Sequence, residues 1–306
     1  MTRGSFGRLM DGGVPHRTPA YRALGFSFGV RCTDPILVRY LETLFEPFQA
    51  SGEPMTWYSL GEIAEAGAPL YVLYCDDVLL DTHREPSQVF STLLWHVNRR
   101  VVADSQDHLL IHASAVTLED VALLFPAPME SGKTTLAAGL VRAGFSYATD
   151  EIVALDPDSG LIEPFPRALS VDPGSWTVLA DLCPEVPAGV ERYLRDQWQV
   201  SPSSIRTDAI AGLTRIGYVI TPRYSPGATS HLEPLPRASA VTEMAEHAFN
   251  FHTFGPAGLR LLARIARRSI CRRLTVGDLD AACDLLRNLV YGVEPSRIHP
   301  VGAERS

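Results

Sequence analysis

The sequence predicts an α/β fold in which a core domain is preceded by a small N-terminal α/β domain and followed by C-terminal helices. Short apolar runs with the alternation of strands recur along the chain, as at Phe26–Cys32. Between them, apolar residues recur at helical spacing, as in Pro35–Phe48. Near the middle of the chain, the apolar run Val121–Phe125 leads through a short loop to a helix that starts near Thr134. Strands that alternate with helices favour the α/β class.

The first 104 residues divide into a tail and a small domain. Residues 1–20 are rich in Gly, Pro and Arg, show no periodicity and are expected to be disordered. Residues 21–104 are expected to form the small α/β domain, in which no pattern points to chemistry. Its expected strands and helices are Phe26–Cys32, Met55–Leu60, Tyr71–Cys75, Pro35–Phe48 and Pro86–Val101.

Residues 105–295 are expected to form the core domain. Its expected strands are Leu109–Val116, Val121–Phe125, Phe145–Ala148, Ile152–Leu155, Ile216–Thr221 and His231–Leu235. A helix is expected over Thr134–Ala143, because Gly144 follows it at the position where glycine commonly ends a helix. Three further helices are expected at 239–249, 256–270 and 276–290.

Composition argues against several classes of protein. The 306 residues are 46% hydrophobic and 20% charged, which is typical of a soluble globular protein, and the net charge of −8 disfavours nucleic-acid binding. No apolar run approaches the roughly 18 residues needed to cross a bilayer, and the N-terminus lacks the apolar segment of a secretory signal. The five cysteines are scattered and indicate reduced thiols. We therefore expect a cytoplasmic protein without nucleic-acid or membrane partners.

Lys133 is the only lysine among the 27 basic residues, and it ends the short loop at the middle of the chain. The loop matches the P-loop pattern Gly-x-x-x-x-Gly-Lys-Ser/Thr, with Ala127 in the first glycine position. In such a loop, backbone N–H groups and the helix N-terminus bind phosphates. Lys133 would contact the β- and γ-phosphates, and the Thr134 hydroxyl would bind Mg²⁺. The residues expected to contact the nucleotide are Ala127, Met129, Glu130, Ser131, Gly132, Lys133, Thr134 and Thr135.

Two further features lie close to this loop in the sequence. Asp150 and Glu151 follow a short strand, and phosphoryl transfer needs one carboxylate to order Mg²⁺ and one to accept a hydroxyl proton. The alternative interpretation of this pair is a solvated turn. His112 lies in an apolar strand, where it is either an active-site residue or a buried core histidine.

The stretch from Leu110 to Ser170 resembles the HPr kinase/phosphorylase superfamily, and especially its shorter HPr-kinase-related members. The segments that carry the resemblance, in order, are His112-Ala113-Ser114-Ala115-Val116, Pro126-Ala127-Pro128-Met129-Glu130-Ser131-Gly132-Lys133-Thr134-Thr135-Leu136, Thr149-Asp150-Glu151 and Pro164-Phe165-Pro166-Arg167. The resemblance implies that the P-loop core has an HPr-kinase-like fold.

The resemblance also implies roles for single residues and for two cofactors, ATP and Mg²⁺. Asp150 would be the base that deprotonates the acceptor serine, His112 would lie near the phosphoryl group, and Lys133 would complete the catalytic set. Glu151 and Thr134 would bind the metal. Arg167 would contact phosphate or lie on the surface.

The acceptor implied by the resemblance is a serine of a peptide or small protein. Some relatives of this length phosphorylate a ribosomally made precursor, such as a lasso peptide. The bacterial segment that helps to recognise HPr is missing, and Glu130 replaces a glycine common in the relatives. The alternatives are a kinase for a small-molecule hydroxyl and a nucleotide-responsive binding module without transfer. We also expect a homo-oligomer.

The stretch Gly258–Leu274 is expected to be helical and is rich in arginine. It would bind an acidic peptide or phosphate, or present a solvated face. Pro222-Arg223-Tyr224 and Asn250-Phe251 are candidates for lining the nucleotide or acceptor site. His247 and His252 are five residues apart, on different faces of a helix, which argues against a metal pair.

Overall fold

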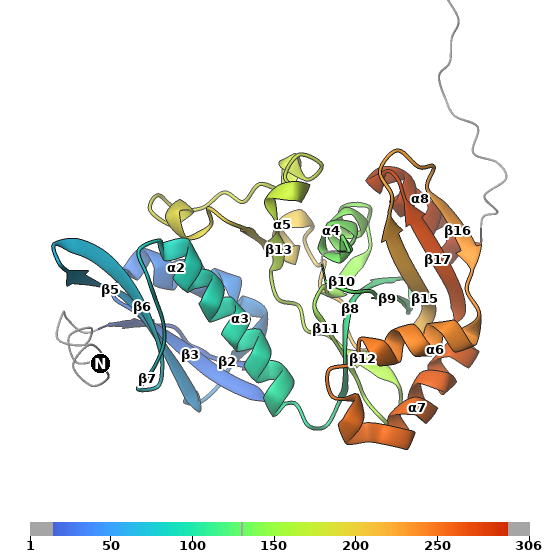
Figure 1. Ribbon diagram of the computed structural model, residues 1–306, viewed down its shortest axis with the longest axis horizontal. Helices are drawn as coiled ribbons and strands as arrows, with labels where there is room; N and C mark the ends of the chain where they lie inside the picture. The colour runs from blue at the N-terminus through green and yellow to red at the C-terminus, as the bar shows by residue number, and fades with distance from the viewer. Residues whose placement is uncertain (1–14, 130, 293–306) are drawn as a thin grey trace, which may run out of the picture.

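Two large β-sheets lie side by side along the long axis of the molecule, each with its own helices, and a third sheet contains two short strands (Figure 1). The structure is a computed structural model and describes residues 15–129 and 131–292. The predicted α/β class is confirmed at this level, because strands and helices alternate over both sheets.

The N-terminal sheet contains seven strands in the order β4-β2-β3-β5-β6-β7, with β1 paired to β3. Their bounds are β1 His16–Arg17, β2 Ala20–Ala23, β3 Phe26–Cys32, β4 Gln49–Ala50, β5 Thr56–Glu65, β6 Ala68–Cys75 and β7 Val78–His83. Strand β1 corrects the prediction of a disordered tail through residue 20, because His16 and Arg17 pair with Cys32 and Arg31 of β3. The remainder of that predicted tail, residues 1–14, lies outside the described residues.

Helices α2 (Pro35–Leu44) and α3 (Pro86–Asp104) pack on this sheet. Helix α2 begins where Asp34 accepts hydrogen bonds from the first free backbone N–H groups and where Pro35 supplies a helical φ. One face of α3 is buried in the core of the N-terminal sheet, through Val89, Phe90, Leu93, Val97 and Val101. The other face of α3 is therefore available to border a site.

The second sheet has the order β10-β8-β11-β12-β15-β17-β16, with β9 paired to both β8 and β15. The strands are β8 Leu109–Leu118, β9 Val121–Pro126, β10 Ser146–Thr149, β11 Ile152–Leu155, β12 Leu161–Glu163, β15 Thr214–Tyr224, β16 His231–Pro234 and β17 Ile270–Val276. The three strands β9, β15 and β17 are parallel. A helix that follows a central strand such as β9 begins at the carboxyl edge of the sheet, where ligands commonly bind in α/β proteins.

Helices cover both faces of the second sheet. One face packs against α6 (Arg237–Glu246) and α7 (Phe251–Arg268), and the other packs against α4 (Lys133–Arg142) and α8 (Leu279–Val290). In Figure 1, α4 and α8 lie above the sheet and α6 and α7 lie below it. Strand β8 alternates between these two cores, since Ile111 faces one and Val116 faces the other.

The arginine-rich stretch does not continue as a helix, which corrects the sequence prediction. Helix α7 ends at Arg268, and Ile270–Val276 forms β17 between β15 and β16. Two of the six arginines, Arg272 and Arg273, are therefore strand residues. The pairing of β17 with two neighbouring strands overrides the helical spacing, because it satisfies the backbone on both sides while Cys271 and Leu274 are buried.

A long segment between two paired strands of the second half of the chain packs against the N-terminal sheet. It is the stretch 172–197, between β13 (Leu169–Val171) and β14 (Trp198–Val200), and we refer to it as the bridging arm. Val190, Tyr193 and Leu194 of this arm are buried in the core of the N-terminal sheet. Because this core includes residues from both parts of the chain, the predicted domain boundary near residue 104 stays a prediction.

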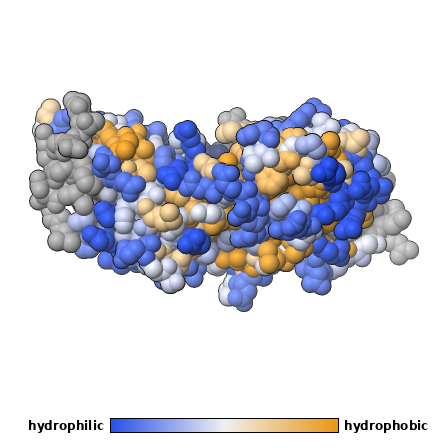
Figure 2. Space-filling model, turned by 90° about the horizontal axis from the view of Figure 1, so that it is seen from below, coloured by the Kyte–Doolittle hydropathy of each residue, from blue (hydrophilic) through white to orange (hydrophobic). Residues whose placement is uncertain are grey.

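Hydrophilic residues cover most of the face in Figure 2, and hydrophobic residues form separate groups over both halves of the molecule. Within the described part of the chain, no helix combines the length and the apolar character needed to cross a bilayer.

Candidate functional site

The loop between β9 and α4 brings backbone N–H groups to the start of a helix. Strand β9 ends at Pro126 and α4 begins at Lys133, with Gly132 at the N-cap. Gly132 has φ 83° and ψ 15°, a left-handed conformation that costs little only for glycine. Helix α4 therefore directs its unpaired N–H groups and the positive end of its dipole toward the loop. Glu130 of this loop lies outside the described residues.

Lys133 is turned into its own loop. The Lys133 side chain donates hydrogen bonds from Nζ to the carbonyl oxygens of Ala127 at 2.9 Å and Pro128 at 2.6 Å, and to Ser131 Oγ at 3.4 Å. Lys133 is only 5% exposed. Burial lowers the pKa of the ammonium group from its ordinary value of 10.5 to about 8. A phosphate placed beside this ammonium would counter that cost of burial.

Thr134 and Asp150 are in direct contact. Strand β10 ends at Thr149, and the next residue, Asp150, lies beside the first turn of α4. The Thr134 hydroxyl donates a hydrogen bond to Asp150 Oδ2 at 2.9 Å. Asp150 is 1% exposed and accepts two further hydrogen bonds at Oδ1, from the Tyr147 hydroxyl at 2.8 Å and from Arg167 Nε at 3.1 Å. This buried carboxylate is therefore fixed by three donors.

Arg167 is a mostly buried partner of the acidic pair at the wall of the cleft, so the alternative that placed it on the surface is wrong. Its side chain is 12% exposed and bonds to both carboxylate oxygens of Asp150, while Nη2 lies 3.8 Å from Glu151 Oε2. Burial opposes the charged guanidinium, but Asp150 and Glu151 outweigh it and raise the pKa of Arg167. The arginine therefore forms ion pairs with both carboxylates and holds them close together.

Glu151, just before β11, faces His112 of the neighbouring strand β8. Glu151 Oε1 lies 3.6 Å from His112 Nδ1, and neither ring nitrogen of His112 has a hydrogen-bond partner among the described residues. Burial, reinforced by the charge of Lys133, lowers the pKa of His112 to about 4, so the imidazole is neutral at pH 7. Burial raises the pKa of Glu151, although Arg167 opposes this effect. The Glu151 side chain remains 33% exposed.

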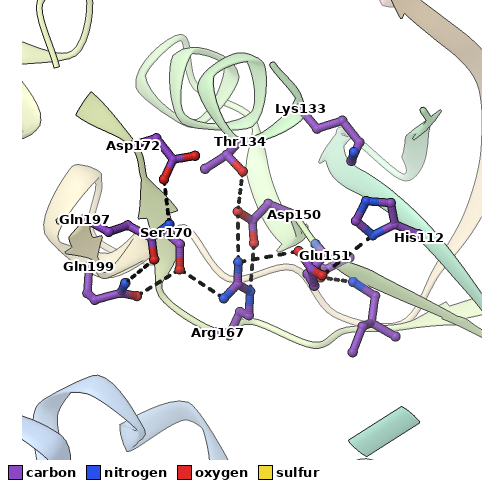
Figure 3. A network of polar contacts seen from close by, with 12 residues as sticks. His112, Lys133, Thr134, Asp150, Glu151, Arg167, Ser170, Asp172, Gln197 and Gln199 are labelled. Carbon is purple, nitrogen blue, oxygen red and sulfur yellow. Dashed lines mark hydrogen bonds and ion pairs between the residues drawn. The ribbon is translucent and has the colours of Figure 1, made fainter. Parts of the chain in front are cut away.

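A chain of polar contacts links the acidic pair to the bridging arm (Figure 3). Arg167 Nη1 donates to Ser170 Oγ, which donates to Gln199 Oε1, each over 3.1 Å. Gln199 Nε2 then donates to Gln197 Oε1 at 3.0 Å, and Gln197 Nε2 donates to Asp172 at 2.7 Å. The network fixes the position of the acidic pair relative to β13 and β14.

These residues line one cleft of about 610 Å³ between α3 and the start of α4. The predicted site residues found in its wall are His112, Met129, Ser131, Gly132, Lys133, Thr134, Thr135, Asp150 and Glu151. Ala127 lies behind the wall, where its carbonyl accepts from Lys133. The other candidates do not line the cleft, namely Pro222, Arg223, Tyr224, Asn250 and Phe251. Asn250 instead bonds to the backbone of His108 and Leu110.

Sequence analysis missed the opposite wall of the cleft. The lining residues that it missed come from α3, from β13 and from the bridging arm, where Ser175 also contacts Thr135 of α4; they are Ser91, Leu94, Trp95, Asn98, Ser170, Val171, Asp172, Ser175, Asp196 and Gln197. The signal in the sequence was the spacing of positions 91, 94, 95 and 98, which places them on one side of α3, although Leu94 also packs against the core of the N-terminal sheet. Nothing in the sequence related those positions to the loop before α4.

The oxygen atoms around Thr134 suit a magnesium ion. No group of three or more His, Cys, Asp and Glu side chains in the described part of the chain could hold a metal by itself. Mg²⁺ usually takes one or two carboxylates and completes its coordination with substrate phosphates and water. The Thr134 hydroxyl and the adjacent carboxylates of Asp150 and Glu151 fit that requirement.

Comparison with known proteins gives little further information. No protein-family model matches the chain, and no curated protein matches it. Among solved structures, the chain is similar to the Hpr(Ser) kinase/phosphatase from Coxiella burnetii at 12% identity, with a TM-score of 0.29, over 60% of this chain and 97% of that chain. A similarity of this strength establishes neither fold nor function, so the function has to be inferred from the site itself.

Proposed function

We propose that this protein is an ATP-dependent kinase that transfers the γ-phosphoryl group to a serine hydroxyl of a peptide or small protein. The observation that carries the proposal is the contact between Thr134 and Asp150 at 2.9 Å, at the N-terminus of a helix preceded by a glycine-containing loop. A hydroxyl at a helix N-terminus beside a carboxylate is the arrangement that nucleotide-hydrolysing and nucleotide-transferring P-loop proteins use around Mg²⁺.

The nucleotide would be held by the loop and by the start of α4. Its phosphates would accept hydrogen bonds from the N–H groups near Gly132 and from Lys133, which would exchange the carbonyls of Ala127 and Pro128 for phosphate oxygens. The Lys133 ammonium gains from this exchange, since the phosphates supply negative charge that two carbonyl dipoles lack.

Asp150 and Glu151 would divide two tasks, metal binding and proton acceptance. When bound, Mg²⁺ would neutralise charge on the phosphates. The resemblance of the sequence assigns the proton to Asp150 and the metal to Glu151 with Thr134. The contacts favour the opposite division, because Asp150 already lies on the Thr134 hydroxyl and is fixed by three donors, while Glu151 Oε1 faces His112 without a hydrogen bond.

The transfer itself conserves charge and atoms. The serine oxygen forms a bond to the γ-phosphorus, the bond to the β,γ-bridging oxygen breaks, ADP leaves, and the serine proton passes to the carboxylate that is not on the metal. The neutral imidazole of His112 can donate one hydrogen bond to the transferring group without adding a charge. The protein contributes mainly by positioning and by fixed charge.

Mass spectrometry of serine-containing peptides after incubation with Mg-ATP tests the proposal. We expect a mass increase of one phosphoryl group with the wild-type protein and none with Lys133→Ala, while Arg287→Ala on an exposed helix face keeps the activity. Transfer to small metabolites and never to peptides would make the protein a small-molecule kinase. Tight nucleotide binding without any transfer would instead identify a nucleotide-responsive binding module.

The variants Asp150→Asn and Glu151→Gln assign the two carboxylates. If Asp150 belongs to the metal, Asp150→Asn loses the gain in nucleotide affinity that Mg²⁺ provides, and Glu151→Gln keeps that gain but loses transfer. If the resemblance is right, the two variants exchange these properties. Nucleotide affinity measured by calorimetry with and without Mg²⁺ separates the two cases.

A further inference from the structure

One side of α3 forms part of the cleft wall across from Lys133. Residues Ser91, Leu94, Trp95 and Asn98 of α3 occur at spacings of three and four, so they share one side of the helix, and all four line the cleft. Trp95 is 58% exposed, which is unusual for so large an apolar side chain. The Arg99 guanidinium lies over its indole ring, 5.4 Å from the ring centroid.

Two carboxylates of the bridging arm extend this wall. Asp172 accepts a hydrogen bond from Gln197 at 2.7 Å, and Asp196 accepts one from Gln88 at 2.6 Å. Both donors are neutral amides, and neither carboxylate forms an ion pair with any described residue. Arg195, the nearest basic residue in sequence to Asp196, lies 3.6 Å from Glu85 instead. The two carboxylates therefore keep their charge available to a ligand.

The cleft as a whole carries a net negative charge, as Asp172 and Asp196 do. Its wall carries four carboxylates, Asp150, Glu151, Asp172 and Asp196, and two cations, Lys133 and Arg167, which leaves an excess of two negative charges. Both cations are buried among their own partners. In Figure 3, Asp172 and Gln197 lie on the opposite side of Asp150 from Lys133 and His112. A polyanionic nucleotide is favoured at the Lys133 end and repelled at the Asp172 end.

We infer that the face formed by Trp95, Leu94, Asp172 and Asp196 is the docking surface for the acceptor, and that the acceptor is a peptide segment with a basic residue beside its serine. This inference rests on the proposed function, because it assumes that a second substrate enters the cleft next to a nucleotide. The basic side chain pairs with the carboxylates of the bridging arm. The indole of Trp95 packs against the neighbouring apolar part of the peptide, since exposed tryptophans in such positions contribute strongly to binding.

The test compares two fluorescein-labelled peptides that differ at one position, with Arg or Glu beside the serine. Anisotropy with wild-type protein, without nucleotide, should give an affinity about fivefold higher for the Arg peptide, the effect of one or two solvent-exposed ion pairs. Asp196→Asn should remove most of that preference, and raising the salt to about 0.5 M should do the same. Trp95→Ala should lower the affinity for both peptides by about tenfold.

Matched controls are exposed residues outside the cleft. Asp158→Asn removes an exposed carboxylate, and Tyr224→Ala removes an aromatic side chain that is similarly exposed, so both should leave peptide affinity unchanged. Equal affinity of the two peptides, or no measurable binding of the Arg peptide, would overturn the inference. So would a Trp95→Ala protein that loses nucleotide affinity and keeps peptide affinity, because the indole would then hold the nucleobase.

The same peptides separate this inference from the proposed function. Preference for the Arg peptide in binding, without phosphoryl transfer from ATP to either peptide, would keep the docking surface and reject the kinase. Transfer to both peptides with the same kcat/KM, unaffected by Asp196→Asn, would keep the kinase and reject the docking surface.

Discussion

Removal of Arg167 should destabilise the protein far more than removal of an arginine in an exposed ion pair. The Asp150 side chain is fully buried and that of Arg167 is 12% exposed, with Nε 3.1 Å from Oδ1. Arg167→Ala leaves a buried carboxylate without its cation, which typically costs about 3–5 kcal/mol in the free energy of unfolding. Tyr147 and Thr134 still donate hydrogen bonds to Asp150, and these remaining hydrogen bonds favour the lower end of this range.

Urea denaturation followed by circular dichroism measures this loss. Arg287→Ala is the matched control, because Arg287 pairs with Asp284 at 2.6 Å while both side chains are about half exposed, and its loss should cost roughly 0–1 kcal/mol. The double variant Arg167→Ala with Asp150→Asn should be more stable than Arg167→Ala alone, since no buried charge remains unpaired. A loss below about 1 kcal/mol for Arg167→Ala, or a double variant less stable than the single one, would refute the reasoning.

Three further predictions concern stability. Gly132→Ala forces a side chain into the left-handed conformation at φ 83°, so the free energy of unfolding should fall by about 1–2 kcal/mol in urea denaturation, whereas the same change at the exposed Gly174, where nothing is crowded, should be nearly neutral. Gly277→Ala places Cβ against the carbonyl oxygen of Ala228, so it should cost at least about 1–3 kcal/mol by the same measurement; an unchanged midpoint would contradict that contact. Because the pKa of His112 is lowered from 6.5 to about 4, the unfolded chain binds a proton that the folded chain excludes. The stability should therefore fall as the pH decreases from 6.5 toward 4, and His112→Gln should flatten that part of the profile; identical profiles would remove His112 as the cause.

Prediction from the sequence was reliable for elements that depend only on neighbouring residues. Strand β9, the loop and helix α4 lie close to their predicted positions, because an apolar run, a glycine N-cap and helical spacing are all properties of neighbouring residues. Residues 270–274 of β17 were predicted as part of a helix, because that prediction also used only the spacing of neighbouring residues. The helical spacing is real, but the pairing of β17 with β15 and β16 depends on partners distant in sequence.

In the candidate site, too, the residue types could be predicted from the sequence, whereas their arrangement depends on the tertiary structure. His112, Lys133, Thr134, Asp150 and Glu151 were selected from residue types and spacing, and the structure brings all of them to one cleft, while their roles stay predictions. The loop residue Glu130, the acceptor, the homo-oligomer and the cytoplasmic location are likewise not tested by the structure.

By itself, the sequence determined the α/β class, the loop before α4 and the residue types able to bind phosphate and metal, because these depend on short-range pattern and side-chain chemistry. Only the tertiary structure decided that Arg167 is buried against Asp150 and that Trp95 and Asp196 face the Lys133 loop across a cleft. Trp95 and Asp196 are about a hundred positions apart in the chain, and the bridging arm that carries Asp196 packs into the N-terminal core through Tyr193. No local periodicity can specify such a contact, since its free energy comes from burying two distant surfaces against each other.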